Sequence, residues 1–507
     1  MNLAYSTIYC IKGEEGGIIA RNDKDTELVL GIIATVGTDT TDVIEILCQQ
    51  LKFFRYDTKE IRVSKEIISR FETETPVFEN EYERVSHYMD LGNEIRKRAN
   101  DSSILMKGVA SSLYLARNRD SEGRSQPKAR QAYIINSLKN PEEVEFMRDT
   151  YGDAFHLIGI TSDYDRRVRT LVVRNGLTEG QAVRLLARDE DEDVAQGQHT
   201  RDAFQHSDYF IQVTEDRDKT YNAISRLIDL LFGNPFISPN FEEYAMFMAY
   251  ATSLRSADLS RQVGAVVAKE QEILSMGVND CPRAGGGLYW PVEREHGKYE
   301  DELDGRDYML GYDSNKREQE RIIESVLKVL GRRNTAENIA KIKKAGIGDL
   351  TEYGRVVHAE MEALLSCARN NVSCRGAELF VTTFPCHNCA KHIIASGIKR
   401  VVYIEPYPKS KAFDFYPAEI SNGLSGSDRK VVFEPFVGVG PQKFVDLFSV
   451  SSTKWYERKR KAADKLHKAQ WKREEAELRN PISLINYLDA EANALMAFEE
   501  ETIAFNS

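Results

Sequence analysis

Two short motifs, separated by one predicted strand, constrain this chain more than any other feature. The first is His358-Ala359-Glu360 in "VVHAEMEALL", at the expected start of a helix. The second is "FPCHNCAKHII", where Cys386 and Cys389 are three residues apart at the start of another helix and so face one side. Between them, "AELFVTT" has the apolar, β-branched composition of a buried strand. A fold that brings both helix starts together would hold a metal there.

The residue types indicate which metal. One imidazole and two thiolates supply three ligands for tetrahedral zinc and leave the fourth position to water. We therefore predict His358, Cys386 and Cys389 as ligands and Zn²⁺ as the cofactor. Zinc makes a water molecule available as a nucleophile near neutral pH. Glu360 lies two residues beyond His358, so it can reach that water without ligating the metal and is the predicted catalytic proton carrier.

The combined pattern is H-x-E followed by P-C-x-x-C, with Pro385 in place. It is the signature of zinc-dependent nucleobase deaminases, which replace the amino group of cytosine or adenine by oxygen. The backbone near Ala359 and Pro385 is then expected to hold the base by its polar edge. The alternative is a closed zinc knuckle with His387 or His392 as fourth ligand. Such a site would leave Glu360 without a role.

Length and charge exclude several classes of protein. At 507 residues the chain is long enough for about three domains. The net charge of −11 argues against a protein that coats nucleic acid by charge alone. The start of the chain lacks the pattern of a secretion signal, and no apolar run approaches about 18 residues. These features predict a cytoplasmic protein without a membrane span.

Strands alternate with helices in the first half, which predicts an α/β fold with a parallel sheet. The first strand, at 27–37, leads into a degenerate phosphate loop. A working loop reads G-x-x-x-x-G-K-[ST]. Here Gly37 is present, but Thr38 stands at the lysine position, Asp39 at the hydroxyl position, and the first glycine is displaced to Gly31. Because an aspartate repels phosphates, we do not expect phosphoryl transfer.

The proline-containing stretch "FGNPFISPN", residues 232–240, marks a domain boundary. We therefore expect an α/β chain with three parts: a parallel-sheet domain at 1–235, a cytidine-deaminase-like αβα domain at 240–435 with an insertion at about 291–350, and a charged helical extension at 436–507.

The second part resembles the deoxycytidylate deaminases. "ATSLRSADLSRQVGAVV", "ILSMGVNDCP", "HAEMEAL" and "FPCHNCAKHIIASGIKRVVY" follow that family's order of motifs over about residues 244–435. The resemblance implies that Asn279 touches the sugar and base of the substrate. It also implies that Arg255, Ser256 and Arg261 lie near the phosphate. Ordinary roles stay open: the arginines could be surface residues, and Asn279 could cap a turn.

A polar loop, "EPYPKSKAF", follows the last strand of this region and contains Tyr407 and Lys409. Its composition is equally compatible with a phosphate contact and with a simple turn. We include both residues among the expected substrate contacts.

The first part resembles P-loop nucleotide kinases through "YIINSLKNPEEVEFMRDTYGDAFHLIGITSDYDRRVR", with Asn136 where those enzymes usually have an aspartate. A degenerate kinase-like domain joined to a deaminase resembles the bacterial antiviral cytidine deaminases. That resemblance implies deamination of dCTP and dCMP, which depletes the deoxycytidine nucleotide pool during phage infection. It further implies control of the resting enzyme, in some members by an inhibitory small RNA. We also expect a regulatory nucleotide, Mg²⁺ accompanying the nucleotide phosphates and, from the resemblance to deoxycytidylate deaminases, a homo-oligomer that is a hexamer.

Other functions remain open at this stage. They are a polynucleotide deaminase acting on RNA or single-stranded DNA, a housekeeping dCMP deaminase serving dTMP synthesis, and a nucleotide-binding regulator whose zinc is structural. The basic segment "KWYERKRKAADKLHKAQWKREE" carries Trp455, Tyr456 and Trp471. It either packs these aromatic rings on the body of the protein or contacts RNA.

Overall fold

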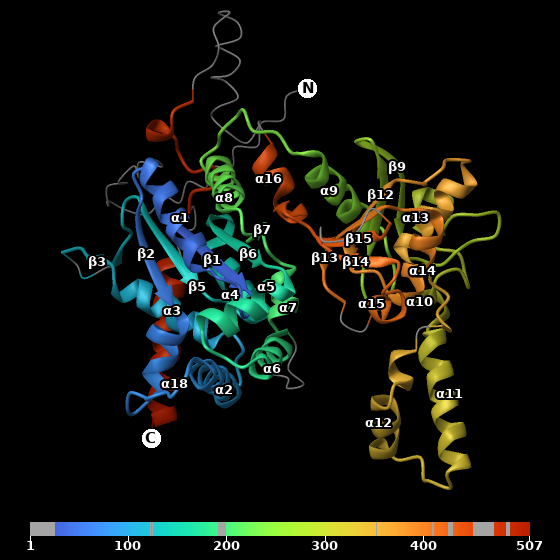
Figure 1. Cartoon of the computed structure of the whole chain (residues 1–507), viewed down its shortest axis with the longest axis horizontal. Helices are drawn as coiled ribbons and strands as arrows, with labels where there is room; N and C mark the ends of the chain where they lie inside the picture. Colours follow the sequence, from blue (N-terminus) through green and yellow to red (C-terminus); the bar gives the residue numbers. More distant parts are fainter. Residues whose placement is uncertain are drawn as a thin grey trace, which may run out of the picture.

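The computed structural model describes residues 26–121, 123, 125–190, 199–350, 352–407, 410–423, 429–449, 471–482 and 487–506. It shows two α/β domains that lie side by side (Figure 1). Three residues singled out in the sequence, Lys409, Trp455 and Tyr456, lie outside the described part.

The first domain is built on a six-stranded sheet of order β16-β7-β6-β1-β5-β2. All neighbouring strands are parallel except β16, which pairs antiparallel with β7. Every residue of β1 is buried, as its apolar sequence predicts for a central strand. The strands are β1 (Leu28–Ala34), β2 (Asp57–Arg62), β5 (Gln131–Asn136), β6 (Phe155–Thr161), β7 (Tyr209–Gln212) and β16 (Gly438–Val439). A short hairpin of β3 (Asn118–Arg119) and β4 (Ser125–Gln126) lies apart from the sheet.

Helices cover both faces of this sheet because side chains alternate along each strand. Leu30 and Ile32 pack with α1 and α8, whereas Val29 and Ile33 pack with α3, α4 and α18. The helices are α1 (Thr41–Phe53), α2 (Glu81–Ala99), α3 (Ile104–Leu115), α4 (Pro141–Tyr151), α5 (Tyr164–Arg169), α6 (Glu179–Glu190), α7 (Thr200–Phe204) and α8 (Arg217–Leu231). Short helical turns are η1 (Val63–Ile67), η2 (Ile68–Phe71), η3 (Gly152–Ala154) and η4 (Thr170–Arg174).

The loop after β1 is closed by its own contacts. The Asp39 carboxylate accepts a hydrogen bond of 3.1 Å from the Thr41 backbone N–H at the start of α1, and it pairs with Arg174. The hydroxyl of Thr38 lies 3.1 Å from that of Thr35. An internal carboxylate therefore occupies the helix N-terminus, a position that binds phosphate in other proteins.

The two glycines of the degenerate phosphate loop have local structural roles. Gly37 adopts φ 81°, a left-handed turn conformation. Gly31 lies inside β1, where an added Cβ would meet the Phe155 ring at 2.8 Å. It is thus required for packing within the sheet and does not face the loop.

The second domain has a sheet of order β14-β15-β13-β12-β8-β9. The four strands from β14 to β12 are parallel, and β8 pairs antiparallel with both β12 and β9. Val266 and Phe380 face α9, whereas Val267 and Val381 face α13 and α14, so the domain has three layers. The strands are β8 (Gly264–Lys269), β9 (Glu272–Val278), β12 (Glu378–Thr383), β13 (Arg400–Glu405), β14 (Ile420–Asn422) and β15 (Val431–Pro435). The helices are α9 (Phe241–Ser253), α13 (Ala359–Arg369), α14 (His387–Ser396) and α15 (Ala412–Phe415).

The insertion forms a helical arm that extends away from the second domain (Figure 1). Its two long helices, α11 (Ser314–Val329) and α12 (Ala336–Lys344), lie side by side. The smaller elements of the insertion are β10 (Val292–Glu293), η5 (Glu295–Gly297), β11 (Tyr299–Glu300), α10 (Asp307–Leu310) and η6 (Ile347–Asp349).

The segment after the second domain returns to the first. Besides β16, it contains η7 (Pro441–Lys443), α16 (Phe444–Phe448), η8 (Arg473–Glu475) and α18 (Tyr487–Asn506). Helix α18 packs on α3, and its buried Glu491 pairs with Arg117, which also pairs with Glu27 at 2.8 Å. Trp471 lies 5.9 Å from the Phe54 ring, so this aromatic residue of the basic segment packs on the body. Residues 436–507 were predicted to form a separate extension, but β16 and α18 pack into the first domain, against partners that lie far away in the sequence.

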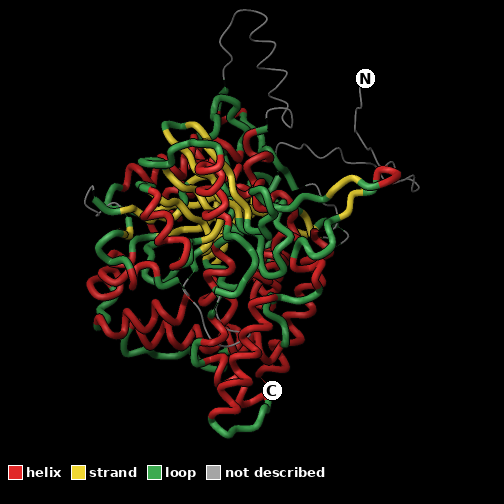
Figure 2. The backbone as a smooth tube through the Cα atoms, turned by 90° about the vertical axis from the view of Figure 1, so that its right-hand side faces the viewer, coloured by secondary structure: helices red, strands yellow, loops and turns green. Residues whose placement is uncertain are grey.

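One hydrophobic core runs through both domains. It joins Val29 and Phe155 of the first sheet to Val266 and Phe380 of the second. Figure 2 shows most of the strands gathered together in the upper half of the molecule, with helices beside and below them. Within the described residues, no helix combines the length and apolar character that a membrane crossing needs.

Candidate active site

The predicted metal ligands lie at two helix starts on one face of the second sheet. His358 is the N-cap of α13, and Cys386 is the N-cap of α14. Strand β12 ends at Thr383, so Phe384 and Pro385 carry the chain directly from the sheet edge to Cys386. The sequence predicted this helix–strand–helix arrangement, and the structure confirms it.

The backbone of α13 lies very close to the backbone of strand β9. Gly277 of β9 lies so near the helix that an added Cβ would meet the Ala359 carbonyl oxygen at 2.2 Å and the Ala363 nitrogen at 2.3 Å. Only glycine permits this contact, which places the first turn of α13 against the sheet. The positions of His358 and Glu360 therefore depend on the absence of a side chain at residue 277 of β9.

The three ligand side chains converge. His358 Nδ1 lies 3.4 Å from Cys386 Sγ and 3.3 Å from Cys389 Sγ. Zinc bond lengths and tetrahedral angles imply a nitrogen–sulfur separation of about 3.5 Å. The donor set and its spacing therefore fit zinc. Within the described residues, the metal-binding group contains these three side chains and no fourth, which favours an open position over a closed knuckle.

Hydrogen bonds among the three ligands shift their proton affinities. The bond from the Cys389 thiol, together with His358, lowers the pKa of Cys386 to about 4. The same contact with Cys386 raises the pKa of Cys389 well above its usual range. The Cys386 side chain raises the pKa of His358 to about 9. A metal ion that binds here must displace these shared protons, so its affinity will depend on pH.

Glu360 lies beside the ligand set and is almost fully enclosed, with 4% of its surface exposed. Burial raises the pKa of its carboxyl group to about 7, and it forms a hydrogen bond with Cys389. A carboxyl group that changes protonation near neutral pH is suited to general acid–base work.

Two of the predicted substrate contacts hold the protein itself together. The Ser256 hydroxyl donates to the Asn279 carbonyl oxygen at 2.6 Å. The Asn279 side chain accepts from the Val263 N–H at 2.7 Å and donates to the Arg261 carbonyl oxygen at 2.8 Å. Asn279 therefore shapes the loop that precedes β8, and its contact with a substrate stays a prediction.

Arg255 and Arg261 have separate environments. Arg255 donates to the Tyr289 carbonyl oxygen at 2.6 Å and stacks over Trp290, with its guanidinium carbon 3.7 Å from the ring centroid. It therefore ties α9 to the loop that leads into the insertion. Arg261 is 46% exposed at its side chain and pairs with Glu405 at 2.8 Å. It also lies 5.7 Å from the Tyr407 ring, so two of the predicted residues are neighbours.

Glu405 is a partner of Arg261 that was not singled out from the sequence. It ends β13 and accepts a hydrogen bond of 2.8 Å from the Thr383 hydroxyl at the end of β12, in addition to its pair with Arg261. The available signal was its position after the strand "RVVYI", because parallel strands end at a common edge of the sheet. Pro385 and Ala359 are buried, and the Pro385 carbonyl oxygen accepts from the Ser410 hydroxyl at 2.8 Å.

Comparison with known proteins agrees with this site. Residues 239–405 match the model of the cytidine and deoxycytidylate deaminase zinc-binding region. The chain is 34% identical over 165 residues to a deoxycytidylate deaminase of Enterobacteria phage T4, covering 32% of this chain and 77% of that protein. It is 30% identical over 212 residues to the deoxycytidylate deaminase of Homo sapiens, covering 41% of this chain and 87% of the relative. The chain belongs to the deoxycytidylate deaminase family.

As a member of the deoxycytidylate deaminase family, the protein is a hydrolytic deaminase, which the two motifs predicted. The matched zinc-binding region contains all three predicted ligands. A dCMP deaminase from the cyanophage S-TIM5, solved with dCMP and dUMP, is 24% identical and covers 39% of this chain and 98% of its own. Its TM-score of 0.22 is too low to support a conclusion. The two relatives named above cover at most 41% of this chain, so most of it has no counterpart in them.

Proposed function

We propose that this protein deaminates free deoxycytidine nucleotides, dCMP or dCTP, to the deoxyuridine nucleotides and ammonia. The observation that carries the proposal is the buried Glu360 beside the His358, Cys386 and Cys389 set. The named substrate of the relatives, deoxycytidylate, supports the choice of a free deoxynucleotide.

The chain's own residues perform the proton transfers in this proposal. His358, Cys386 and Cys389 would hold zinc, which supplies a water molecule activated for attack on C4 of the base. The Glu360 carboxylate takes a proton from that water and delivers it to N3 of the ring. Glu360 then passes the second proton of the water to the exocyclic amino group, which leaves as ammonia. Water and cytosine are thus converted to uracil and ammonia, and Glu360 returns to its starting state.

The buried position of Glu360 serves this cycle. Because the carboxyl group is shielded from solvent, its pKa of about 7 lets it both accept and release a proton near neutral pH.

Arg261 and Tyr407 are the proposed contacts for the substrate phosphate. Arg261 lies in the loop before β8, is partly exposed and pairs with Glu405 at the end of β13. Its guanidinium carbon is 5.7 Å from the centroid of the Tyr407 ring. Arg255 is a weaker candidate because its guanidinium group is engaged by Tyr289 and Trp290. Lys409 stays a candidate from the sequence, as do Ser256 and Asn279 through the loop that they shape.

The first domain supports a further part of the proposal. Its five parallel strands, numbered along the chain, have the order 2-3-1-4-5 around a central first strand, compatible with the resemblance to P-loop nucleotide kinases. We propose a kinase-like domain without phosphoryl transfer. Depletion of deoxycytidine nucleotides in antiviral defence and an inhibitory small RNA belong to the proposal through the resemblance to antiviral cytidine deaminases. A homo-oligomer such as a hexamer belongs to it through the resemblance to deoxycytidylate deaminases.

A substrate panel tests the proposed function. Purified zinc-loaded protein is incubated with equal concentrations of dCMP, dCTP, CTP, cytidine and a cytosine-containing oligonucleotide, and the products are separated by chromatography. We expect dUMP or dUTP to form from the free deoxynucleotides. Exclusive conversion of the oligonucleotide would overturn the proposal and favour the polynucleotide deaminase.

A further inference from the structure

A cavity of about 880 Å³ opens in the first domain, among residues that the deaminase reaction does not use. It lies at the carboxyl ends of β1, β2 and β5 and is bounded by η1, η2 and α2. Ligands of open parallel sheets bind beyond the carboxyl ends of the strands, where the strand order reverses. The cavity lies at this carboxyl edge of the sheet, beyond the strands on the β5–β2 side of β1.

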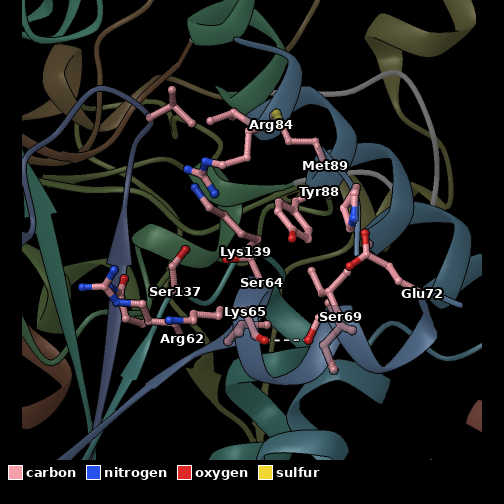
Figure 3. A pocket seen from close by; sticks show the side chains of 18 of the residues that line it. Arg62, Ser64, Lys65, Ser69, Glu72, Arg84, Tyr88, Met89, Ser137 and Lys139 are labelled. Carbon is pink, nitrogen blue, oxygen red and sulfur yellow. Dashed lines mark hydrogen bonds between the residues drawn. The ribbon is translucent and has the colours of Figure 1, made fainter. Parts of the chain in front are cut away.

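The cavity is lined by more cations than anions. Arg62, Lys65, Arg84 and Lys139 line it together with the buried Arg96, against Glu72 and Glu74. Figure 3 shows Arg84 and Lys139 close to each other near the centre, with Lys65 and Arg62 on the side of Ser64 and Ser137. Lys65 is exposed and has no ion-pair partner among the described residues. The other four cations are each paired with a carboxylate, namely Glu60, Glu81, Glu143 and Asp189. Lys65 therefore supplies the uncompensated positive charge that would attract an anionic ligand.

Lys139 places an ammonium group beside the degenerate loop. Its ammonium group donates to the Ala34 carbonyl oxygen at 2.9 Å, at the carboxyl end of β1, and to Asp189 at 2.7 Å. Asp189 also accepts from the Val36 N–H at 2.7 Å, so it fixes the lysine and the loop together. The lysine missing at Thr38 is thus replaced by one from the loop after β5, and a third ammonium hydrogen is left for a ligand.

Hydroxyl groups and an aromatic ring complete the lining. Thr40 and Thr41 line the cavity at the start of α1, and Ser64 and Ser137 follow β2 and β5. These are hydrogen-bond donors suited to phosphate oxygens. On the side of α2, the half-buried Tyr88 and the apolar residues around it offer a surface for a planar ring (Figure 3).

We propose that this cavity binds a nucleoside phosphate, without transferring a phosphoryl group. The phosphates contact Lys65, Lys139 and Arg84, and the base lies against Tyr88. The volume is within the range of about 300–1,000 Å³ that small-molecule sites occupy. This site is distinct from the zinc centre, so the protein has two nucleotide sites, one for the substrate and one that does not perform chemistry.

Equilibrium binding to the full-length chain tests this inference. ATP, GTP, dATP and dTTP are titrated by calorimetry into the Glu360→Gln variant, which is expected to retain zinc and to deaminate about 10²–10⁴-fold more slowly than the parent. Tripolyphosphate and adenosine are titrated separately as the two parts of the ligand. We expect at least one of the four nucleotides to bind, and adenosine to bind at least about 100-fold more weakly because it lacks the charged contacts.

The variants Lys65→Ala and Arg84→Ala should each weaken nucleotide binding by about tenfold or more. Arg98→Ala is the matched control, because Arg98 lies on the same helix and forms a similar surface ion pair, with Glu94, but does not line the cavity. It should bind as the parent does. The inference is overturned if none of the four nucleotides binds below about 1 mM, if both cavity variants bind normally, or if tripolyphosphate binds as tightly as every nucleotide.

Discussion

The candidate site combines side chains whose usual ionisation the fold changes. Cys386 and Cys389 lie three residues apart, yet the pKa of the first falls to about 4 and that of the second rises well above its usual range. Hydrogen bonding between the two side chains favours the thiolate form of Cys386 and the thiol form of Cys389. Zinc requires both as thiolates, so metal binding and proton release are coupled at this site.

Replacing one ligand should remove the metal. In Cys389→Ser, a hydroxyl group is a much poorer zinc ligand than a thiolate, and two good protein ligands remain. We expect zinc content to fall from about one atom per chain to less than a tenth of that value, with loss of deamination. Metal analysis after dialysis measures this.

Cys367→Ser is the matched control, since Cys367 is also a buried cysteine of the second domain but lies outside the ligand set. It should keep its zinc. Full zinc content in Cys389→Ser would contradict the assignment of Cys389 as a ligand.

At the scale of elements, the active site depends on how closely helix α13 packs on strand β9. In Gly277→Ala the new methyl group would meet backbone atoms of Ala359 and Ala363, which cannot move without shifting the helix. We expect a loss of stability of about 1–3 kcal/mol. Deamination should fall by about 100-fold, because displacement of His358 and Glu360 by about 1 Å is enough for that loss.

Gly180→Ala is the control for this substitution. Gly180 lies in helix α6, and an added Cβ there would have only the end of Arg184 nearby, at 3.7 Å. Activity should be unchanged in that variant. Wild-type activity in Gly277→Ala would show that the close approach does not position the site.

The start of α9 joins three elements through one buried carboxylate. Glu243 completes the capping box with Asn240, pairs with Arg226 of α8 at 2.6 Å, and accepts from the Val439 N–H of β16 at 2.9 Å. In Glu243→Ala, Arg226 loses its partner and a buried N–H is left unsatisfied. We expect destabilisation of about 3–5 kcal/mol, measured by urea unfolding.

The neighbouring Glu242→Ala provides the comparison. Glu242 is partly exposed, and its partner Arg400 keeps Glu378 and Glu434. This substitution should cost less than about 1 kcal/mol. Equal costs for the two variants would show that Glu243 does not join the domains as described.

For the whole molecule, a buried histidine couples stability to pH. Burial on β6, reinforced by the charge of Lys443, lowers the pKa of His156 to about 3. Below pH of about 6.5 the unfolded chain therefore binds a proton that the folded chain excludes. The free energy of unfolding should be about 1.4 kcal/mol lower at pH 5.5 than at pH 7.5 from this residue alone.

Comparison with His156→Leu isolates this contribution. The variant should lose that part of the pH dependence and keep the part due to other groups. Parallel stability curves for the parent and His156→Leu between pH 5.5 and 7.5 would contradict the assignment.

The features that could be predicted from the sequence are those determined by local patterns along the chain. His358, Cys386 and Cys389 could be found because metal ligands need particular residue types at fixed spacing, and β1 because a central parallel strand is apolar throughout. Lys139 and Asp189 could not be paired in advance, since they are separated along the chain and meet only when the sheet forms. The same holds for Glu491 of α18, which reaches Arg117 across most of the chain.

The measurement that tests the central claim most directly is turnover by Glu360→Gln with its metal content known. The parent and the variant are purified in parallel, their zinc is quantified, and release of ammonia from dCMP and dCTP is followed. We predict that the parent deaminates at least one of them, and that the variant retains zinc but is slower by about 10²–10⁴-fold. Unchanged turnover in the zinc-loaded variant would contradict the assignment of Glu360, and no turnover of either nucleotide by the zinc-loaded parent would contradict the proposed function.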